Sequence, residues 1–102
     1  MKNIAIVFVA ACGFAFAGAP EGKTVFAAKC QPCHGPNGEG KAAIAKMYQV
    51  EMHPLASKEV QAKTDAEFKK TITGGGGKMK PVTGLSDKQI EDIIAFVRTL
   101  KG

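Results

Sequence analysis

The run Cys30-Gln31-Pro32-Cys33-His34 constrains this chain more than any other part of its sequence. Two thiols separated by two residues, with a histidine directly after the second, form the pattern C-x-x-C-H. This pattern is typical of covalent c-type haem attachment. Each thiol can add to one of two vinyl groups on neighbouring rings of the macrocycle. His34 then lies beneath the iron, where an imidazole nitrogen can serve as the proximal ligand.

Three other uses of this cysteine pair fit the sequence less well. A thioredoxin-like dithiol requires a βαβ context, and no such pattern of strands and helices occurs here. A tetrahedral zinc site needs further ligands, but the chain has no second C-x-x-C pair. A disulfide across two residues would be strained, and it would leave His34 unexplained. The sequence therefore favours haem c, with one group attached at Cys30 and Cys33.

The first 17 residues match a secretory signal peptide, with a basic start, an apolar stretch at 4–16 and small residues at its end. The run Ala15-Phe16-Ala17 fits the small-x-small rule, so we expect cleavage after Ala17. The apolar stretch is shorter than the roughly 20 residues that span a bilayer. Export to the periplasm, with no membrane span after signal removal, is the expectation. An uncleaved membrane anchor is the alternative.

Cys12 lies inside this apolar stretch. Val9-Ala10-Ala11-Cys12 resembles the short box before the lipid-modified cysteine of bacterial lipoproteins, so a lipid anchor at Cys12 is a second alternative. Cleavage after Ala17 leaves residues 18–102 as a single domain. The loss of Lys2 with the signal lowers the formal charge of +5 by one. The remaining lysines are spread along the chain without the clustering typical of nucleic-acid binding.

The remaining sequence has helical patterns separated by loops, and no segment alternates as a strand, so the expected fold class is all-α. We expect helices at 21–29 and at 41–48. A third begins at Thr64, where Thr64 and Glu67 form a capping box, and four glycines at 74–77 end it. The last is capped by Ser86, and its apolar residues recur at helical spacing: Ile90, Ile93, Ile94, Phe96, Val97 and Leu100.

The iron of such a haem needs either a sixth ligand or an open face. The candidates after His34 are His53 and three methionines, Met47, Met52 and Met79. Bis-histidine ligation through His53 would be stable, although a histidine beside Pro54 in a polar loop is more often a surface residue. Met47 falls in a stretch with helical periodicity, which favours a place in the core. Met79 lies in a glycine-rich loop that can pass closely over a flat macrocycle.

From residue 18 onward, the chain resembles a class I cytochrome c over essentially its whole length. The matching features are Gly22-x-x-x-Phe26, C-x-x-C-H at 30–34, Gly35-x-x-Gly38, Ile72-x-Gly74, Met79 near Pro81, and Asp92-Ile-Ile-Ala-Phe96-Val. The resemblance implies a small cytochrome c-like fold of three to five helices wrapped around one covalently attached haem. The chain departs from the family in having Lys80 between Met79 and Pro81, where many members have Met followed directly by Pro.

The resemblance also assigns roles to particular residues. It implies that Met79 is the distal iron ligand, opposite His34. It implies a close crossing of the first and last helices, with Gly22 near Phe96 and Phe26 near Ile93. A backbone carbonyl, commonly of a proline after the motif, is expected to accept the N–H of the proximal histidine. Pro36 and Pro54 are both available for this bond.

His34/Met79 ligation leaves no site for a substrate, so we expect an electron carrier rather than an enzyme. The chain would shuttle single electrons between redox partner proteins, as a monomer and without nucleic acid. Lys29, Lys78 and Lys80 are placed to steer a partner with an acidic docking surface. Two alternatives remain: a haem enzyme or sensor that reduces peroxide or binds gas at an open sixth site, and a bound subunit of a larger redox complex.

Overall fold

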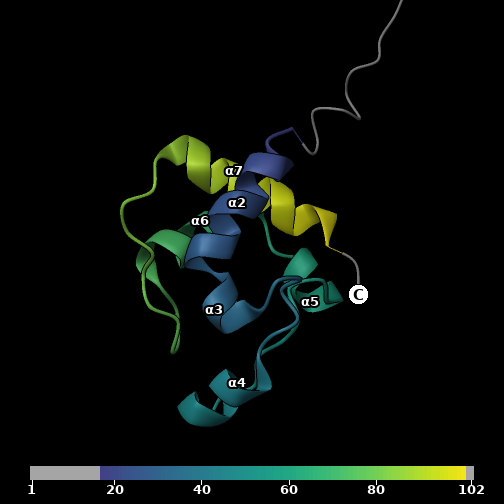
Figure 1. Ribbon diagram of the computed structural model, residues 1–102, viewed down its shortest axis with the longest axis vertical. Helices are drawn as coiled ribbons and strands as arrows, with labels where there is room; N and C mark the ends of the chain where they lie inside the picture. Colours follow the sequence, from purple (N-terminus) through teal and green to yellow (C-terminus); the bar gives the residue numbers. More distant parts are fainter. Residues whose placement is uncertain (1–16, 101–102) are drawn as a thin grey trace, which may run out of the picture.

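The computed structural model describes residues 17–100, and this part of the chain folds into helices without a strand (Figure 1). The helices are α2 (Ala19–Lys29), α3 (Gln31–His34), α4 (Ala42–Tyr48), α5 (Lys58–Gln61), α6 (Asp65–Gly74) and α7 (Asp87–Thr99). The all-α expectation is confirmed. The described residues hold six helices instead of three to five, because α3 and α5 are single turns of four residues each that the periodicity does not reveal.

Local sequence signals account for where the main helices begin. Helix α2 begins at Ala19, two residues before the expected start, because Pro20 is well placed in a first turn where its missing N–H is not needed. Both later helices begin with a capping box. Thr64 and Glu67 exchange backbone-to-side-chain bonds of 2.8 and 3.1 Å at α6. Ser86 and Gln89 do the same at α7, with bonds of 2.9 and 3.1 Å.

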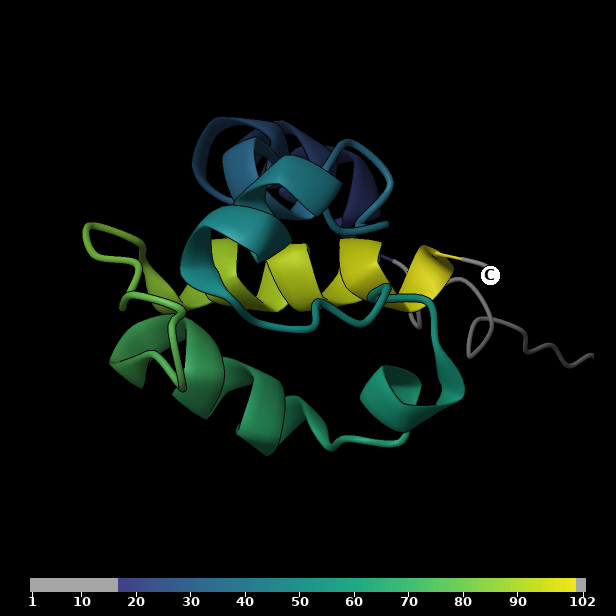
Figure 2. The ribbon, with the colours of Figure 1, turned by 90° about the horizontal axis from the view of Figure 1, so that it is seen from below.

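The core is centred on α7, which lies between α2 on one side and α6 on the other (Figure 2). Its buried apolar side chains meet those of the two neighbouring helices. The buried set is Phe26, Cys30, Phe68, Ile72, Ile90, Ile93, Ile94, Phe96 and Val97. The apolar stripe expected for the last helix is therefore the main wall of the core.

Helices α2 and α7 cross closely at Gly22. A Cβ at this position would overlap the backbone carbonyl of Asp92 and lie 2.9 Å from the amide nitrogen of Ile93. The expected crossing at a glycine is confirmed, but the nearest neighbours of Gly22 are Asp92 and Ile93, one helical turn before Phe96. Phe26 packs on Phe96, with ring centroids 5.1 Å apart and ring planes at 58°, in the same buried cluster as Ile93. This tilted arrangement is a favourable one for aromatic pairs.

Arg98 of α7 holds the segment before α6 against this last helix through hydrogen bonds. Its guanidinium donates to the carbonyls of Gln61 and Lys63 at 2.8 and 2.7 Å, and it pairs with Asp65 at 2.7 Å. The same group lies 4.6 Å from the ring centroid of Phe68. These contacts fix the start of α6 and the chain that leads into it, which form one side of the cavity described next.

Candidate cofactor site

A cavity of about 750 Å³ opens between the helices and the loops, and it brings together all four residues predicted to hold a cofactor: Cys30, Cys33, His34 and Met79. Its volume is within the range of about 300–1,000 Å³ for small-molecule and cofactor sites. The rest of the lining is largely apolar, as expected for a site that takes a flat aromatic group. These lining residues run from Lys29 to Thr83 and come from the end of α2, from α3 to α6, and from the loops that follow these helices.

The C-x-x-C-H segment is folded as a tight helical turn that directly continues α2. The amides of Cys33 and His34 both donate to the carbonyl of Cys30, at 3.2 and 2.9 Å. Two bonds then tie the turn to the following loop: Gly40 donates to the His34 carbonyl at 2.7 Å, and Lys41 donates to the Cys33 carbonyl at 3.1 Å. The backbone of the motif is therefore held in place by hydrogen bonds on both sides.

The two cysteines are free thiols in different surroundings: Cys30 is buried and Cys33 is exposed. Burial, with a smaller contribution from neighbouring Cys33, raises the pKa of the Cys30 thiol to about 11. Cys30 is therefore protonated at neutral pH. The disulfide alternative is not realised in the structure, and both sulfurs line the cavity, where they can form thioethers to a bound group.

His34 lines the cavity and carries a buried Nδ1 that has no hydrogen-bond partner. We predicted a hydrogen bond from this histidine to the backbone carbonyl of Pro36 or Pro54. In the structure, His34 Nδ1 donates to neither of these carbonyls. Burial lowers the pKa of His34, so the imidazole is neutral at pH 7. Neutral imidazole is the form that ligates metals. A half-buried imidazole with an unpartnered nitrogen is costly unless the ring has another role, such as binding iron.

Met79 is held at the cavity by a tight turn within the glycine-rich segment. The amide of Met79 donates to the Gly76 carbonyl at 2.8 Å, and the amide of Gly76 donates to the Met79 carbonyl at 3.0 Å. This pair of bonds closes a two-residue hairpin in which Gly77 has a φ of 55°. A glycine is favoured at this position because a positive φ is required there. The glycine-rich loop predicted around Met79 is therefore closed by a hydrogen-bonded turn.

The other candidate ligands divide into two groups. Met52 and His53 also line the cavity, and the His53 ring Nε2 lies 3.9 Å from Glu51 Oε1. Met47 is 65 % exposed, so the expectation that it belongs to the core is wrong. The reason is that α4 buries none of its residues, and its helical periodicity therefore does not mark a core face.

The sequence does not identify several apolar residues as part of the cavity wall. Ile44, Tyr48, Leu55, Val60 and Val82 all line the cavity, and three of them lie outside the long helices in loops or short turns. Ile44 and Tyr48 have helical spacing on α4, whereas Leu55, Val60 and Val82 stand apart from any helical or strand period, so periodicity could not mark these three. The available signal is the apolar character of residues in segments that are otherwise polar.

The mouth of the cavity is basic. Lys29, Lys63, Lys78 and Lys80 line it, against a single acidic lining residue, Glu51. Three of these lysines, at 29, 78 and 80, are the ones expected from the sequence near the exposed edge of the cofactor. Lys63 was not predicted from the sequence to lie there. Its backbone carbonyl accepts a hydrogen bond from Arg98, which holds this segment in place.

The arrangement fits a covalently attached haem better than a bare metal ion. Two thiols on one helical turn, an adjacent neutral imidazole and a thioether all line one cavity with largely apolar walls. Within residues 17–100, no three His, Cys, Asp or Glu side chains gather as they would around a metal ion. This finding argues against the zinc alternative for the described part of the chain, because a structural zinc site takes four such ligands.

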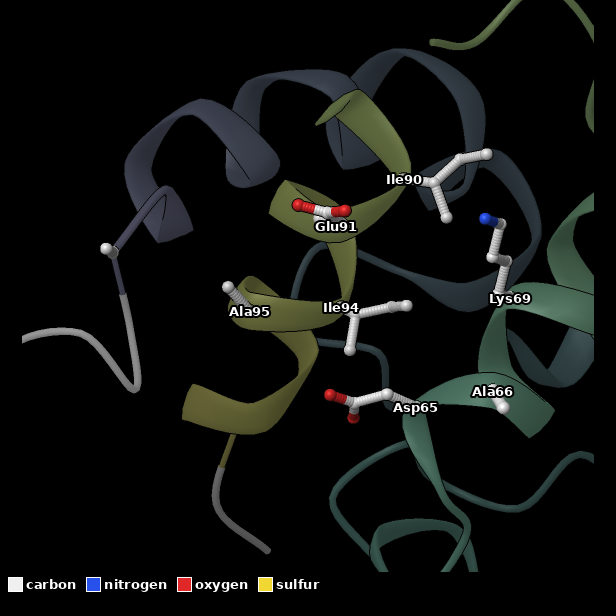
Figure 3. A pocket seen from close by; sticks show the side chains of 8 residues that line it. Asp65, Ala66, Lys69, Ile90, Glu91, Ile94 and Ala95 are labelled. Atoms are coloured by element: carbon white, nitrogen blue, oxygen red, sulfur yellow. The ribbon is translucent and has the colours of Figure 1, made fainter. Parts of the chain in front are cut away.

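A second cavity, of about 470 Å³, lies on the outer side of the core (Figure 3). It is lined by Asp65, Ala66 and Lys69 of α6, by Ile90, Glu91, Ile94 and Ala95 of α7, and by Ala17. Its lining residues include no cysteine, histidine or methionine, so this cavity offers nothing to hold a haem iron. The four predicted ligands all belong to the larger cavity.

Comparison with known proteins identifies the family of the chain. The family model for Cytochrome c matches residues 19–101. Cytochrome c-554(547) of Halothiobacillus neapolitanus is 27 % identical over 88 residues, which cover 81 % of this chain and 97 % of that protein. The chain therefore belongs to the class I cytochrome c family.

Two solved structures share the fold. The c-type cytochrome KustC0563 superposes with a TM-score of 0.68 at 23 % identity, over 79 % of this chain and 98 % of that one. Cytochrome cL of Hyphomicrobium denitrificans superposes with a TM-score of 0.63 at 25 % identity, over 85 % of this chain and 49 % of that one. Family membership makes the chain a c-type cytochrome, an electron carrier with covalently bound haem c and redox partners.

Among residues 17–100, none of the helices is both long enough and apolar enough to cross a membrane.

Proposed function

We propose that this chain is a periplasmic electron shuttle with a single haem c, bound through thioethers to Cys30 and Cys33 and ligated by His34 and Met79. The observation that carries the proposal is that all four side chains line one cavity, although Met79 is 45 residues from His34 in the sequence. Bound there, haem c supplies an iron that takes up and releases one electron reversibly.

The chain's own residues determine what this site can do. His34 and Met79 would both ligate the iron, which would leave no position on it for a substrate. The soft sulfur of Met79 favours the ferrous state and so raises the reduction potential relative to a site with histidine alone. Hydrogen bonds hold the backbone at both ligands, at the turn before Gly35 and at the hairpin of Gly76 and Met79, so little rearrangement accompanies each electron.

Export is part of the proposal. Residues 1–16, including Cys12, lie outside the described part of the chain, and Ala17 is its first residue. We propose that residues 1–17 are a signal peptide cleaved after Ala17 and that residues 18–102 form the mature domain. The signal pattern and the covalent mode of haem attachment support this proposal. The mature protein is proposed to be a monomer.

Optical spectra of the matured protein in both oxidation states test the ligation. We expect a c-type spectrum with the weak far-red band of methionine sulfur on ferric haem, and slow binding of carbon monoxide and cyanide. A c-type spectrum without that band, or rapid binding of carbon monoxide, would contradict the His34/Met79 assignment. That outcome would instead support an open site or ligation by His53, and with it the enzyme or sensor alternative.

The basic mouth of the cavity predicts a charge effect on electron-transfer rates. With the anion ferricyanide as oxidant, Lys78→Glu and Lys80→Glu should each lower the second-order rate constant by roughly 3- to 10-fold at low ionic strength. High salt should abolish the difference, because it screens exposed charges. Stopped-flow kinetics measure the rates, and the reduction potential should hardly change.

Lys23→Glu is the matched control for these variants, because it makes the same change of charge at an exposed position on α2 that does not line the cavity. Equal rates for all three variants would show that the cavity mouth does not steer its partners. The corresponding expectation for a natural partner is an acidic docking surface.

A further inference from the structure

A buried carboxylate lies against the amino end of α2. Asp92 of α7 is 7 % exposed, and it is the one charged residue in the buried set of the described chain. Its side chain packs on Gly18, which immediately precedes α2. A Cβ added to Gly18 would overlap Asp92 Oδ1 and lie 3.1 Å from Asp92 Cγ. The backbone of residue 18 is therefore in direct contact with the carboxylate.

The contact also brings the backbone nitrogen of Gly18 near the carboxylate. The nitrogen and the Cβ position of a residue are bonded to the same Cα, so they are separated by only two bonds. Because Oδ1 of Asp92 overlaps the Cβ position, the nitrogen lies within roughly 5 Å of Oδ1. In a free chain end, rotation about the Cα–C bond of Gly18 moves this nitrogen and would allow hydrogen-bond contact.

Asp92 has little to compensate for its burial. Its hydrogen-bond partner within the described chain is Lys88, one turn earlier on the same helix, whose Nζ lies 3.0 Å from both carboxylate oxygens. The Lys88 side chain is 73 % exposed, whereas that of Asp92 is 10 % exposed. A solvated lysine of this kind contributes little. Removing a carboxylate from water is unfavourable unless it is paired and hydrogen-bonded.

The cleavage predicted from the sequence would place a positive charge at the same point. The sequence Ala15-Phe16-Ala17 predicts cleavage between Ala17 and Gly18. A signal peptidase would hydrolyse this peptide bond with one water, leaving the carboxylate on Ala17 and the amine on Gly18. A free α-amino group has a pKa of about 7.7–8.0 and is protonated at neutral pH. Processing would thus convert the neutral amide of Gly18 into an ammonium with three donors.

We propose that the Asp92 carboxylate is a binding site for the α-ammonium group of Gly18 and that removal of the signal completes this ion pair. The inference rests on the proposed cleavage after Ala17, and it is independent of haem ligation and electron transfer. The precursor lacks the pair, because its residue 18 carries no charge. Cleavage therefore strengthens the packing of α2 on α7 in the mature protein.

The test is a stability comparison of mature holoproteins that differ by one residue at the start. Inserting a serine between Ala17 and Gly18 leaves an extra residue ahead of Gly18 after the same cut, which moves the ammonium away from Asp92. Mass spectrometry verifies both amino termini. At pH 6.5, we expect the insertion to raise the unfolding equilibrium constant roughly 5- to 10-fold, as measured by urea denaturation followed by circular dichroism.

The same insertion in an Asp92→Asn background isolates the ion pair. Asparagine has nearly the same shape without the charge, so the insertion should then have no effect. Glu91→Gln, an exposed carboxylate on the same helix, is the matched control, and the full effect of the insertion should persist there. Three results would each overturn the proposal. The first is an insertion that has no effect in the unsubstituted protein, and the second is an equal effect of the insertion in the Asp92→Asn background. The third is a mature protein without the insertion whose amino terminus is not Gly18.

The pH dependence gives a second measurement that needs no substitution at Asp92. Pairing raises the pKa of the ammonium in the folded state, so its stabilisation is fully present below about pH 7.7 and is lost as the pH rises through the raised pKa. The other charged groups around the pair are Lys88 and Glu91 on α7 and Glu21 on α2. The difference between the two proteins should therefore shrink from pH 7 to pH 10, and a constant difference would contradict the ion pair.

Discussion

Met79→Ala is expected to abolish the far-red band of the ferric protein and to lower its reduction potential by on the order of 0.1 V or more. Axial ligands set haem potentials over a range of about 0.8 V, so the loss of a soft sulfur that favours ferrous iron has a large effect. Carbon monoxide should bind quickly to the variant, because its sixth position is open. Potentiometric titration and stopped-flow mixing measure the two quantities.

Two other methionines serve as matched controls. Met47→Ala removes a thioether that is 65 % exposed and does not line the cavity. It should leave the band and the potential unchanged. Met52→Ala removes a thioether that does line the cavity, so it separates ligation of the iron from mere proximity to the iron. If Met52→Ala abolishes the band and Met79→Ala retains it, the assignment of the distal ligand is wrong. Circular dichroism checks that each variant keeps its helical content.

Gly22→Ala is expected to destabilise the protein by about 2–3 kcal/mol, although alanine is the better helix former. In an exposed helix, the exchange of glycine for alanine would stabilise by about 1 kcal/mol. Here the new methyl group would overlap the Asp92 carbonyl, which is backbone and cannot rotate away. The two helices must move apart, and overpacking of this kind typically costs 1–3 kcal/mol and occasionally more. Urea denaturation of the holoprotein measures the change.

Gly74→Ala is the matched control for this substitution, because a Cβ at Gly74 would meet nothing within 4 Å. Gly74 is the last residue of α6, and its φ is not positive. The control should therefore be neutral or slightly stabilising. If both substitutions had the same effect on stability, the close crossing of α2 and α7 would not be the reason for glycine at position 22.

The elements with strong local signals could be predicted from the sequence. The capping box of Thr64 and Glu67 and the apolar spacing of the last helix both depend on neighbouring residues, so each marks its own helix without reference to the fold. The C-x-x-C-H motif is local in the same sense. Its chemistry requires only that its five residues form one turn, which they do.

The remaining features depend on contacts between distant parts of the chain. The neighbours of Gly22 were expected one turn later on α7, because helix pairing can be predicted from sequence but register cannot. Met47 was expected to be buried because a helical period shows which residues share a face. The period does not show whether anything covers that face. The hairpin around Met79 depends on Gly77 taking a positive φ, and four consecutive glycines do not reveal which of them will do so.

The position of α4 has a consequence for local unfolding. This helix buries none of its residues, is capped by Gln49 with a φ of 56°, and lies at the opposite end of the molecule from the crossing of α2 and α7 (Figure 1). Little free energy is therefore needed to open α4 while the rest of the protein stays folded. Its amide hydrogens would exchange with solvent far sooner than those around Phe26 and Ile93. The wall that carries Ile44 and Tyr48 is thus the part of the cavity that can open first to admit its cofactor.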